Sequence, residues 1–448
     1  MSKLTKPLAT KSNHLVKVVY KQLKSTLLEL VPLWQSEPHA DWKRFVRPTG
    51  VGSFSISIES YSGIQSWISF RKKVEGKDCI RLLNTVIEEN QPALFGYVSH
   101  SSSTQKIQGA IGLITCLCHV VSKYMESQPS VEVAIERALT EIEQILSKNI
   151  ASEEIMTPLS GLKLPEDIDQ IDIGKNVILR CLTATEISDI GSNDISSETR
   201  YDISSRFVTT AIIFTRDVRI TVSEQYEQLI PDLHFHQEAQ DQIDAVLCAL
   251  HILKTGRVGV VASFRTLRPT VLPNMSGHSS SPLVVNPFAF MELDHEEVKL
   301  FIDLHNKIIL NKRDEVRIAA TRLVDAESRL SPVDALLDAV IGLEVLLNPN
   351  DYAELSFRVA LNYAYIGNPI DRRKRYENVR DIQKTRNRVV HGGLNLASKD
   401  AALIHEHAAL AKACLRDSIT RFLTDIAFSS RKKLDADFWL DRVIPPNV

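Results

Sequence analysis

The sequence predicts an α+β protein in which mixed and β-rich regions are followed by an all-α helical bundle. Two observations carry this prediction. β-branched runs typical of strands lie before about residue 290, and every apolar pattern after residue 294 has helical spacing. With 448 residues the chain is long enough for two or three domains with buried cores. We expect a helix-rich α+β region, a β-rich domain with one long helix, a helical bundle and a C-terminal tail, over residues 1–155, 156–290, 294–430 and 431–448.

The first region combines helical and strand patterns. Residues 15–34 and 131–148 have the spacing of amphipathic helices, and residues 53–60 alternate as in a strand. The most apolar run, "GAIGLITCLCHVV" at 109–121, is shorter than the roughly 20 residues that span a bilayer. We expect a buried helix there and no membrane attachment.

The middle region is rich in β-branched residues bounded by Gly, Ser and Asp. These patterns predict strands within 174–183, 204–215 and 256–265, and a helix over about 237–255. Gly256 follows that helix in a position that suits a left-handed C-cap. The segment "LPNMSGHSSSPLVVNP", residues 272–287, has the composition of a linker.

The last region predicts six helices joined by short connections, which is typical of an antiparallel bundle. The segment 331–347 opens with Ser331, Pro332 and Asp334, a capped start with proline in the first turn. The six helical patterns cover residues 294–310, 314–330, 331–347, 353–367, 371–390 and 399–428.

Composition excludes several classes of function. The formal net charge is -2, so any nucleic-acid surface must be local, and we expect no DNA partner. The six cysteines form no C-x-x-C pair, which argues against a zinc ribbon or a disulfide framework and favours a reducing cytoplasm. The first residues lack the apolar core of a signal peptide, so we expect a cytoplasmic protein.

Two His-x-His pairs are the only motif that suggests a metal. They are His234 with His236 and His405 with His407. This spacing places both imidazoles on one face of a strand but not of a helix, and no carboxylate or cysteine lies at a familiar offset. The chain has no Walker A, dinucleotide-binding, H-E-x-x-H or G-x-S-x-G motif. We therefore predict neither a metal nor a cofactor.

The segment "DIQKTRNRVVHGG", residues 381–393, contains the best candidate site. At about 100° per residue, Arg386 lies at the centre of an apolar stripe formed by Val379, Ile382, Val389 and Val390. Arg388 points to roughly the opposite side and is expected to be solvated. His391 ends the helix before a C-cap glycine and shares a flank with Asn387.

The flank that carries His391 is basic. It includes Arg373, Arg380 and Lys384, and the stretch 371–388 holds eight basic residues against three acidic ones. This local excess predicts a phosphate-binding track leading to His391, with an ordinary solvated helix face as the alternative.

A second charge interrupts the apolar stripe of another predicted helix. Glu344 lies among Val333, Leu336, Leu337, Val340, Ile341 and Leu347. Since an unpaired buried charge is costly, we predict an ion pair between Glu344 and Arg386. The pair could support a site or be purely structural.

The motif R-N-x-x-x-H, formed by Arg386, Asn387 and His391, resembles the R-x4-6-H signature of HEPN domains. The order of "RLVDAESRLSPVDALLDAVIGLEVLL", "ELSFRVALNYAYIG" and "TRNRVVHGG" is similar to the Apea-like HEPN branch over residues 315–430. The resemblance implies a homodimeric helical bundle that cleaves RNA without metal, in anti-phage defence resembling abortive infection. It also implies that Arg386 and His391 are the catalytic pair, with Asn387 as an orienting residue.

The residue types fit this chemistry. Histidine can move a proton at the 2′-hydroxyl or the 5′-oxygen near neutral pH, and a guanidinium can stabilise a phosphorane-like transition state. One arginine and one histidine are few for both tasks, which favours a site built from two chains. In this hypothesis residues 1–290 sense a trigger or restrain the bundle. The alternatives are a catalytically inactive HEPN module that binds RNA, nucleotide or a partner protein, and a scaffold in which Arg386 and Glu344 form only a salt bridge.

Overall fold

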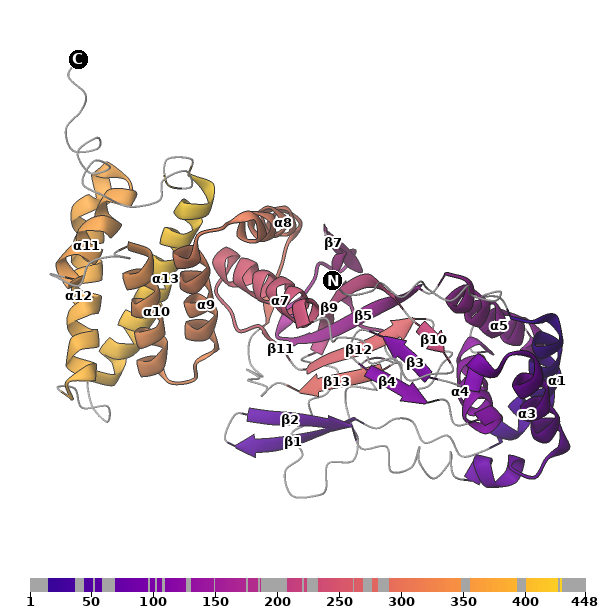
Figure 1. Cartoon of the computed structure of the whole chain (residues 1–448). Coiled ribbons are helices and arrows are strands. Elements are labelled where there is room, and N and C mark those ends of the chain that lie inside the picture. The colour runs from indigo at the N-terminus through magenta and orange to yellow at the C-terminus, as the bar shows by residue number, and fades with distance from the viewer. Residues whose placement is uncertain are drawn as a thin grey trace, which may run out of the picture.

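A computed structural model describes most of the chain. The described residues are 15–36, 44–50, 53–58, 69–95, 97–100, 103–106, 109–125, 130–148, 150–174, 176–183, 186, 208–219, 221–223, 233–260, 262–268, 276–280, 290–347, 355–392, 400–425 and 428. The chain is an α+β protein with an antiparallel sheet in its middle and an all-helical bundle at its C-terminal end. Figure 1 shows a group of N-terminal helices, the sheet and the bundle following one another along the molecule.

The N-terminal helices are α1 (Lys17–Gln35), α3 (Asp78–Asn90), α4 (Gly109–Met125) and α5 (Val131–Lys148). Their apolar faces form a separate core, and the 3-10 helix η1 (Pro92–Phe95) follows α3. Helix α4 buries Leu113, Ile114 and Leu117 completely, which confirms the buried helix predicted for the most apolar run. No helix within the described ranges is long and apolar enough to cross a membrane.

The main sheet has seven antiparallel strands in the order β13-β12-β5-β9-β8-β7, with β11 also paired to β5. Its strands are β5 (Ile150–Ser160), β7 (Gln170–Gly174), β8 (Val177–Cys181), β9 (Val208–Arg219), β11 (Gly259–Val260), β12 (Ala262–Arg268) and β13 (Ser276–Ser280). Helix α7 (Leu233–Leu253) covers one face of this sheet (Figure 1).

Short strands accompany the main sheet. β1 (Arg44–Gly50) pairs with β2 (Ser53–Ile58), and β14 (Met291–Glu292) pairs in parallel with β6 (Leu162–Lys163). A three-stranded sheet is formed by β3 (Tyr97–His100), β4 (Ser103–Lys106) and β10 (Thr221–Ser223).

Three predictions for the middle region need correction. The boundary expected at residue 155 falls inside β5. This strand contains two glutamates and Pro158, residues that are uncommon in strands, so its sequence does not have a typical strand pattern. Residues 276–280, expected in a linker, form β13 and pair with β12, while the rest of that segment lies outside the described residues. Gly256 is not in the left-handed conformation, since α7 already ends at Leu253. A side chain at Gly256 would instead press on Met291, 3.1 Å away.

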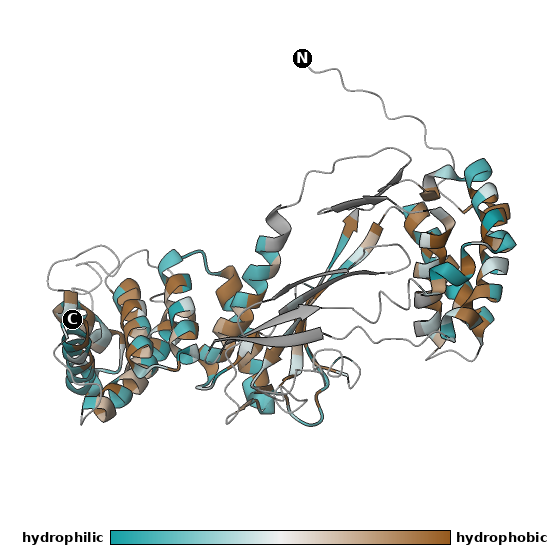
Figure 2. Ribbon diagram, turned by 90° about the horizontal axis from the view of Figure 1, so that it is seen from below, coloured by the Kyte–Doolittle hydropathy of each residue, from teal (hydrophilic) through white to brown (hydrophobic). Residues whose placement is uncertain are grey.

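The bundle consists of helices whose bounds agree closely with the predicted ones. They are α8 (His295–Leu310), α9 (Asp314–Ser328), α10 (Pro332–Leu347), α11 (Leu355–Ile366), α12 (Arg372–Val390) and α13 (Asp400–Thr424), with the 3-10 helix η2 (Pro369–Asp371) before α12. The Ser331 hydroxyl accepts from the backbone N–H of Asp334 at 3.4 Å, as expected for a capped start of α10. Figure 2 shows that hydrophobic residues gather on the faces that these helices turn towards one another.

One continuous apolar core joins the bundle to the sheet. It extends from sheet residues such as Ile155 and Phe214, through α7 and α8, to Phe422 on α13. Helix α7 packs against α8, α9 and α13, so it links the sheet to the bundle. The expected division at about residue 290 is therefore not a break in the packing.

Candidate functional site

Arg386 lies on the buried face of α12, where the sequence predicts it. Val379 and Ile382 on the same face are fully buried, and 28% of the Arg386 side chain is exposed. Val390, which the prediction places on this stripe, is 51% exposed, because it occupies the last position of the helix. The guanidinium therefore belongs to the core side of α12 but lies close enough to its end to reach solvent.

The predicted ion pair between Arg386 and Glu344 is present. The Nη2 atom of Arg386 is 3.9 Å from Oε2 of Glu344, whose side chain is 15% exposed. This separation allows electrostatic attraction but is too long for a hydrogen bond. The carboxylate thus attracts the guanidinium without occupying its N–H donors.

Glu344 lies on a half-buried side of α10, together with Leu337 and Ile341. The most buried side carries Leu336, Val340 and Leu347 of the predicted stripe together with small residues, among them Ala339 and Gly342. A side chain at Gly342 would come within 2.7 Å of Leu415. Small residues let α10 approach its neighbours closely, so the bulky stripe expected from the sequence is only partly the deepest face.

Asn387 connects Arg386 to the flank that carries His391. Its Oδ1 atom accepts a hydrogen bond from Nη1 of Arg386 at 3.2 Å. On a helix at 100° per residue, Asn387 lies between the directions of Arg386 and His391, and it is one turn before His391. The contact therefore turns the guanidinium towards the side of the helix from which the imidazole projects.

His391 occupies the C-cap of α12 and is exposed. Its backbone N–H donates to the carbonyl oxygen of Asn387 at 3.0 Å, and Gly392 follows in the left-handed conformation with φ of 71°. The predicted helix end with a C-cap glycine is confirmed. Arg386 and His391 are five residues apart, or about 7.5 Å along the helix axis.

Arg388 lies on the solvent side, as predicted. Half of its side chain is exposed, and its Nη2 atom is 3.7 Å from Oδ1 of Asp400 at the start of α13. This ion pair spans the connection between α12 and α13. It does not include Arg386 or His391.

The predicted phosphate track is only partly free to bind anions. The side chains of Arg373, Arg380 and Lys384 are all exposed. Arg373 pairs with Glu377 at 3.2 Å, while Arg380 and Lys384 both pair with Asp381, at 3.3 and 3.2 Å. Such exposed pairs are worth little and can exchange partners.

Two of the eight basic residues counted for this region face other parts of the bundle. Arg375 is 14% exposed, pairs with Asp417 at 2.7 Å and donates to the carbonyl oxygen of Tyr363. The Arg372 guanidinium lies over the ring of Tyr365, 4.5 Å from its centroid. The sequence count therefore overestimates the positive charge that faces solvent beside His391.

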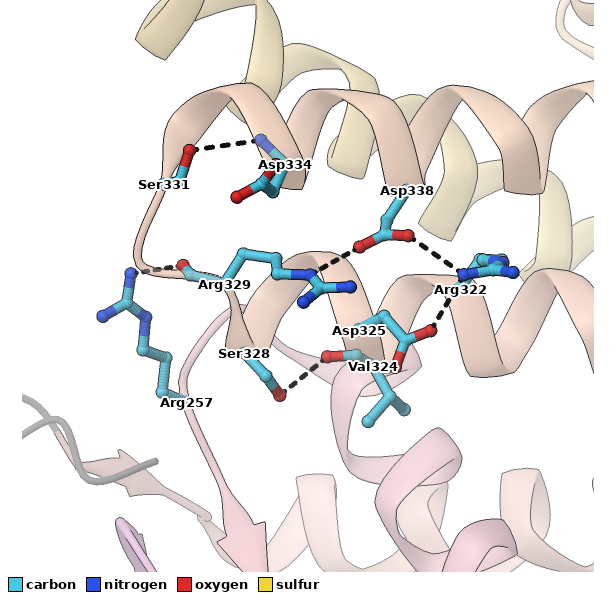
Figure 3. A network of polar contacts seen from close by, with 9 residues as sticks. All are labelled: Arg257, Arg322, Val324, Asp325, Ser328, Arg329, Ser331, Asp334 and Asp338. Carbon is cyan, nitrogen blue, oxygen red and sulfur yellow. Dashed lines mark hydrogen bonds and ion pairs between the residues drawn. The ribbon is translucent and has the colours of Figure 1, made fainter. Parts of the chain in front are cut away.

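Sequence reasoning missed a second buried carboxylate on α10. Figure 3 shows Asp338 between two arginines of the α9 region: it accepts from Nε of Arg329 at 2.8 Å and from Nη1 of Arg322 at 3.0 Å. Burial and the Asp338 carboxylate raise the pKa of the nearby Asp325. Arg257, beyond the end of α7, donates to the carbonyl oxygen of Arg329 (Figure 3). This network ties α10, the helix that also carries Glu344, to the α9 region.

The His-x-His pairs lie in helices, α7 for the first and α13 for the second. His407 accepts from or donates to the Thr385 hydroxyl through Nδ1 at 2.7 Å, while His405 is exposed. In the part of the chain that the structure describes, no group of three or more His, Cys, Asp or Glu side chains could hold a metal ion.

Comparisons of the chain with models of protein families, with curated proteins and with solved structures find no match. The assignment of a function therefore depends on the geometry of the Arg386 site.

Proposed function

We propose that this chain is a metal-independent endoribonuclease of the HEPN type that acts as an effector in anti-phage defence. The observation that carries this proposal is the position of the Arg386 guanidinium and the contacts that hold it there. It is held at the edge of the bundle by Glu344 and Asn387, and it is turned towards the flank of the exposed His391. A fixed cation and an exposed imidazole on the same flank are two of the groups that cleavage of RNA by its own 2′-hydroxyl uses.

In this reaction the 2′-oxygen attacks the adjacent phosphorus and the bond to the 5′-oxygen breaks. His391 moves a proton at one of these two oxygens, and Arg386 stabilises the negative charge that develops on the phosphoryl oxygens. Asn387 keeps the guanidinium on the side of α12 from which the His391 imidazole projects. The products are a 2′,3′-cyclic phosphate and a 5′-hydroxyl.

A second copy of the chain completes the proposed site. One chain provides one Arg386 and one His391, whereas acid and base catalysis at two oxygens calls for two proton-transfer groups. In a homodimer with the C-terminal ends of both α12 helices facing each other, the second imidazole comes from the other chain. Arg373, Arg380 and Lys384 then bind the flanking phosphates of the RNA.

The regions before residue 290 are proposed to sense the trigger or to restrain the bundle. The packing of α7 against α9 and α13 supports this role, since a change in the sheet would reach the bundle directly.

The test is cleavage of a labelled RNA by the full chain in EDTA, with the wild type, His391→Ala and His405→Ala compared. His405 is the matched control because it is an exposed histidine on a neighbouring helix. We expect His391→Ala to lose at least about 100-fold of the cleavage rate. His405→Ala should cleave like the wild type, and circular dichroism should show the same fold for all three.

The competing function is a binding module that holds RNA, nucleotide or a partner protein without cutting it. It predicts RNA binding that survives His391→Ala and no cleavage by the wild type. Equal cleavage rates for the wild type and His391→Ala would overturn the proposed catalytic site.

A further inference from the structure

The carboxylate of Glu344 contacts two residues of α12, one turn apart. Its Oε2 atom faces Nη2 of Arg386, and its Oε1 atom accepts a hydrogen bond from Nε2 of Gln383 at 3.3 Å. Gln383 is only 1% exposed. A neutral amide thus holds one oxygen of the carboxylate while the other is directed at the guanidinium.

The same two residues carry unused hydrogen-bonding atoms. Within the described residues, Oε1 of Gln383 and Nε of Arg386 are both buried and without a hydrogen-bond partner. One is an acceptor and the other is a donor, and residues three apart on a helix lie on the same side. A buried polar atom without a partner costs about 1–3 kcal/mol, so an apolar residue would be the more stable choice if position 383 only filled space.

We propose that Gln383 is a positioning residue for Arg386 that acts through Glu344, an inference that rests on the proposed ribonuclease function. Its N–H group fixes the rotation of the Glu344 carboxylate, which in turn fixes the guanidinium. Its carbonyl oxygen makes no hydrogen bond to Nε–H of Arg386, so the amide acts on the guanidinium through Glu344. Because the amide is uncharged, it orients Glu344 without competing for its charge.

The nature of residue 383 matters for this role. A lysine there would draw the carboxylate away from Arg386, and an apolar residue would leave the carboxylate free to rotate. Glutamine supplies an N–H donor to Glu344 without adding a charge.

The first experiment compares Gln383→Met with Gln242→Met in the full chain. Gln242 is the matched control because it is 6% exposed on α7 and its Oε1 atom is also buried without a partner in the described part of the chain. We expect Gln383→Met to lower kcat for RNA cleavage roughly 10- to 100-fold with KM within about twofold of the wild type, since misplacing a catalytic group by a fraction of an ångström has effects of this order. Gln242→Met should keep the wild-type kcat. Equal kcat values for Gln383→Met and the wild type would overturn the proposal.

The second experiment exchanges the two groups. Gln383→Glu alone places two carboxylates together and should also lose activity. Adding Glu344→Gln restores one carboxylate and one amide in the same space, so the double variant should recover most of the lost kcat. A double variant no more active than Gln383→Glu would overturn the proposed positioning role of Gln383.

A readout without catalysis separates this inference from the proposed function. In the full chain labelled with ¹⁵N-arginine, the Nε–H signal of Arg386 is assigned by its loss in Arg386→Lys. We expect Gln383→Met to shift and broaden it, and the exchanged double variant to restore it. If the wild type cleaves no RNA but the signal responds in this way, the positioning role stands and the ribonuclease function fails. If the wild type cleaves RNA and the signal is unchanged in Gln383→Met, the positioning role fails.

Discussion

Arg416 on α13 donates its Nε–H to the carbonyl oxygen of His251 on α7, at a distance of 2.8 Å. The two residues are far apart in the sequence and belong to the bundle and to the helix that covers the sheet. The guanidinium of Arg416 also contacts Glu327 on α9, which pairs with Lys412 at 2.7 Å. The junction between sheet and bundle is therefore a buried polar cluster within an apolar core.

Removing the central carboxylate of this cluster should destabilise the protein strongly. Glu327 is 3% exposed, so Glu327→Ala leaves the cations of Lys412 and Arg416 without their partner in a poorly solvated site. The expected loss is about 3–5 kcal/mol of unfolding free energy, measured by urea denaturation. Glu296→Ala is the control, because Glu296 is exposed and pairs with Lys299 on the surface. If both variants lose the same small amount, the cluster does not hold the junction together.

The burial of His251 predicts a pH dependence of stability. Desolvation lowers the pKa of His251 to about 4, compared with an ordinary value near 6.5 in the unfolded chain. Between these values the unfolded chain binds a proton that the folded protein does not, so stability falls as the pH falls through this window. His251 should lower the unfolding free energy by about 2 kcal/mol on going from pH 7 to pH 5.

The measurement is the difference in unfolding free energy between pH 7 and pH 5. His251→Phe should reduce that difference by about the stated amount, because the site then takes up no proton. His405→Ala should leave it as in the wild type. An unchanged difference in His251→Phe would mean that the folded protein protonates His251 near its ordinary pKa.

The bundle could be predicted from the sequence because its helices are amphipathic and their ends carry local signals such as Ser331 and Gly392. Strand β5 could not. Its residue Glu153 is buried, and Arg216 of β9 lies opposite and pairs with it at 2.9 Å. The residues next to Glu153 in the sequence do not indicate a partner that lies 63 positions later in the chain. Pro158 further weakens the strand prediction, because proline is uncommon inside sheets.

The candidate site divides in the same way. Arg386 and Glu344 could be paired in advance because each is a lone charge on an apolar stripe and their signs are opposite. Gln383 and Asp338 could not be found, since their roles depend on which helices are neighbours. Periodicity gives the direction of a side chain on its own helix but not the residue that it meets.

The two arginines of the motif should differ in their effect on RNA cleavage. Arg386→Lys keeps the charge but loses the planar guanidinium that contacts Asn387, and we expect a loss of about 100-fold in kcat. Arg388→Lys should stay within about twofold of the wild type, because Arg388 is half exposed and a lysine can keep the ion pair with Asp400. The comparison uses initial rates on the same RNA. Similar losses for both variants would contradict the separation of the buried and the solvated arginine.

The hydrogen bond between Thr385 and His407 offers a test of which histidine takes part in the reaction. Thr385 is 3% exposed, and its hydroxyl is 2.7 Å from Nδ1 of His407, so the bond joins α12 to α13. Thr385→Val should lower the unfolding free energy by about 1 kcal/mol, the usual net value of one hydrogen bond, while cleavage at saturating RNA changes less than about threefold.

His391 is exposed at the helix end, so its replacement by alanine should have the opposite profile, with stability kept and cleavage lost. A Thr385→Val variant that loses cleavage as completely as His391→Ala, at unchanged stability, would place His407 in the catalytic machinery. The proton-transfer group would then lie on the α13 side of α12, away from the flank on which Asn387 holds the Arg386 guanidinium.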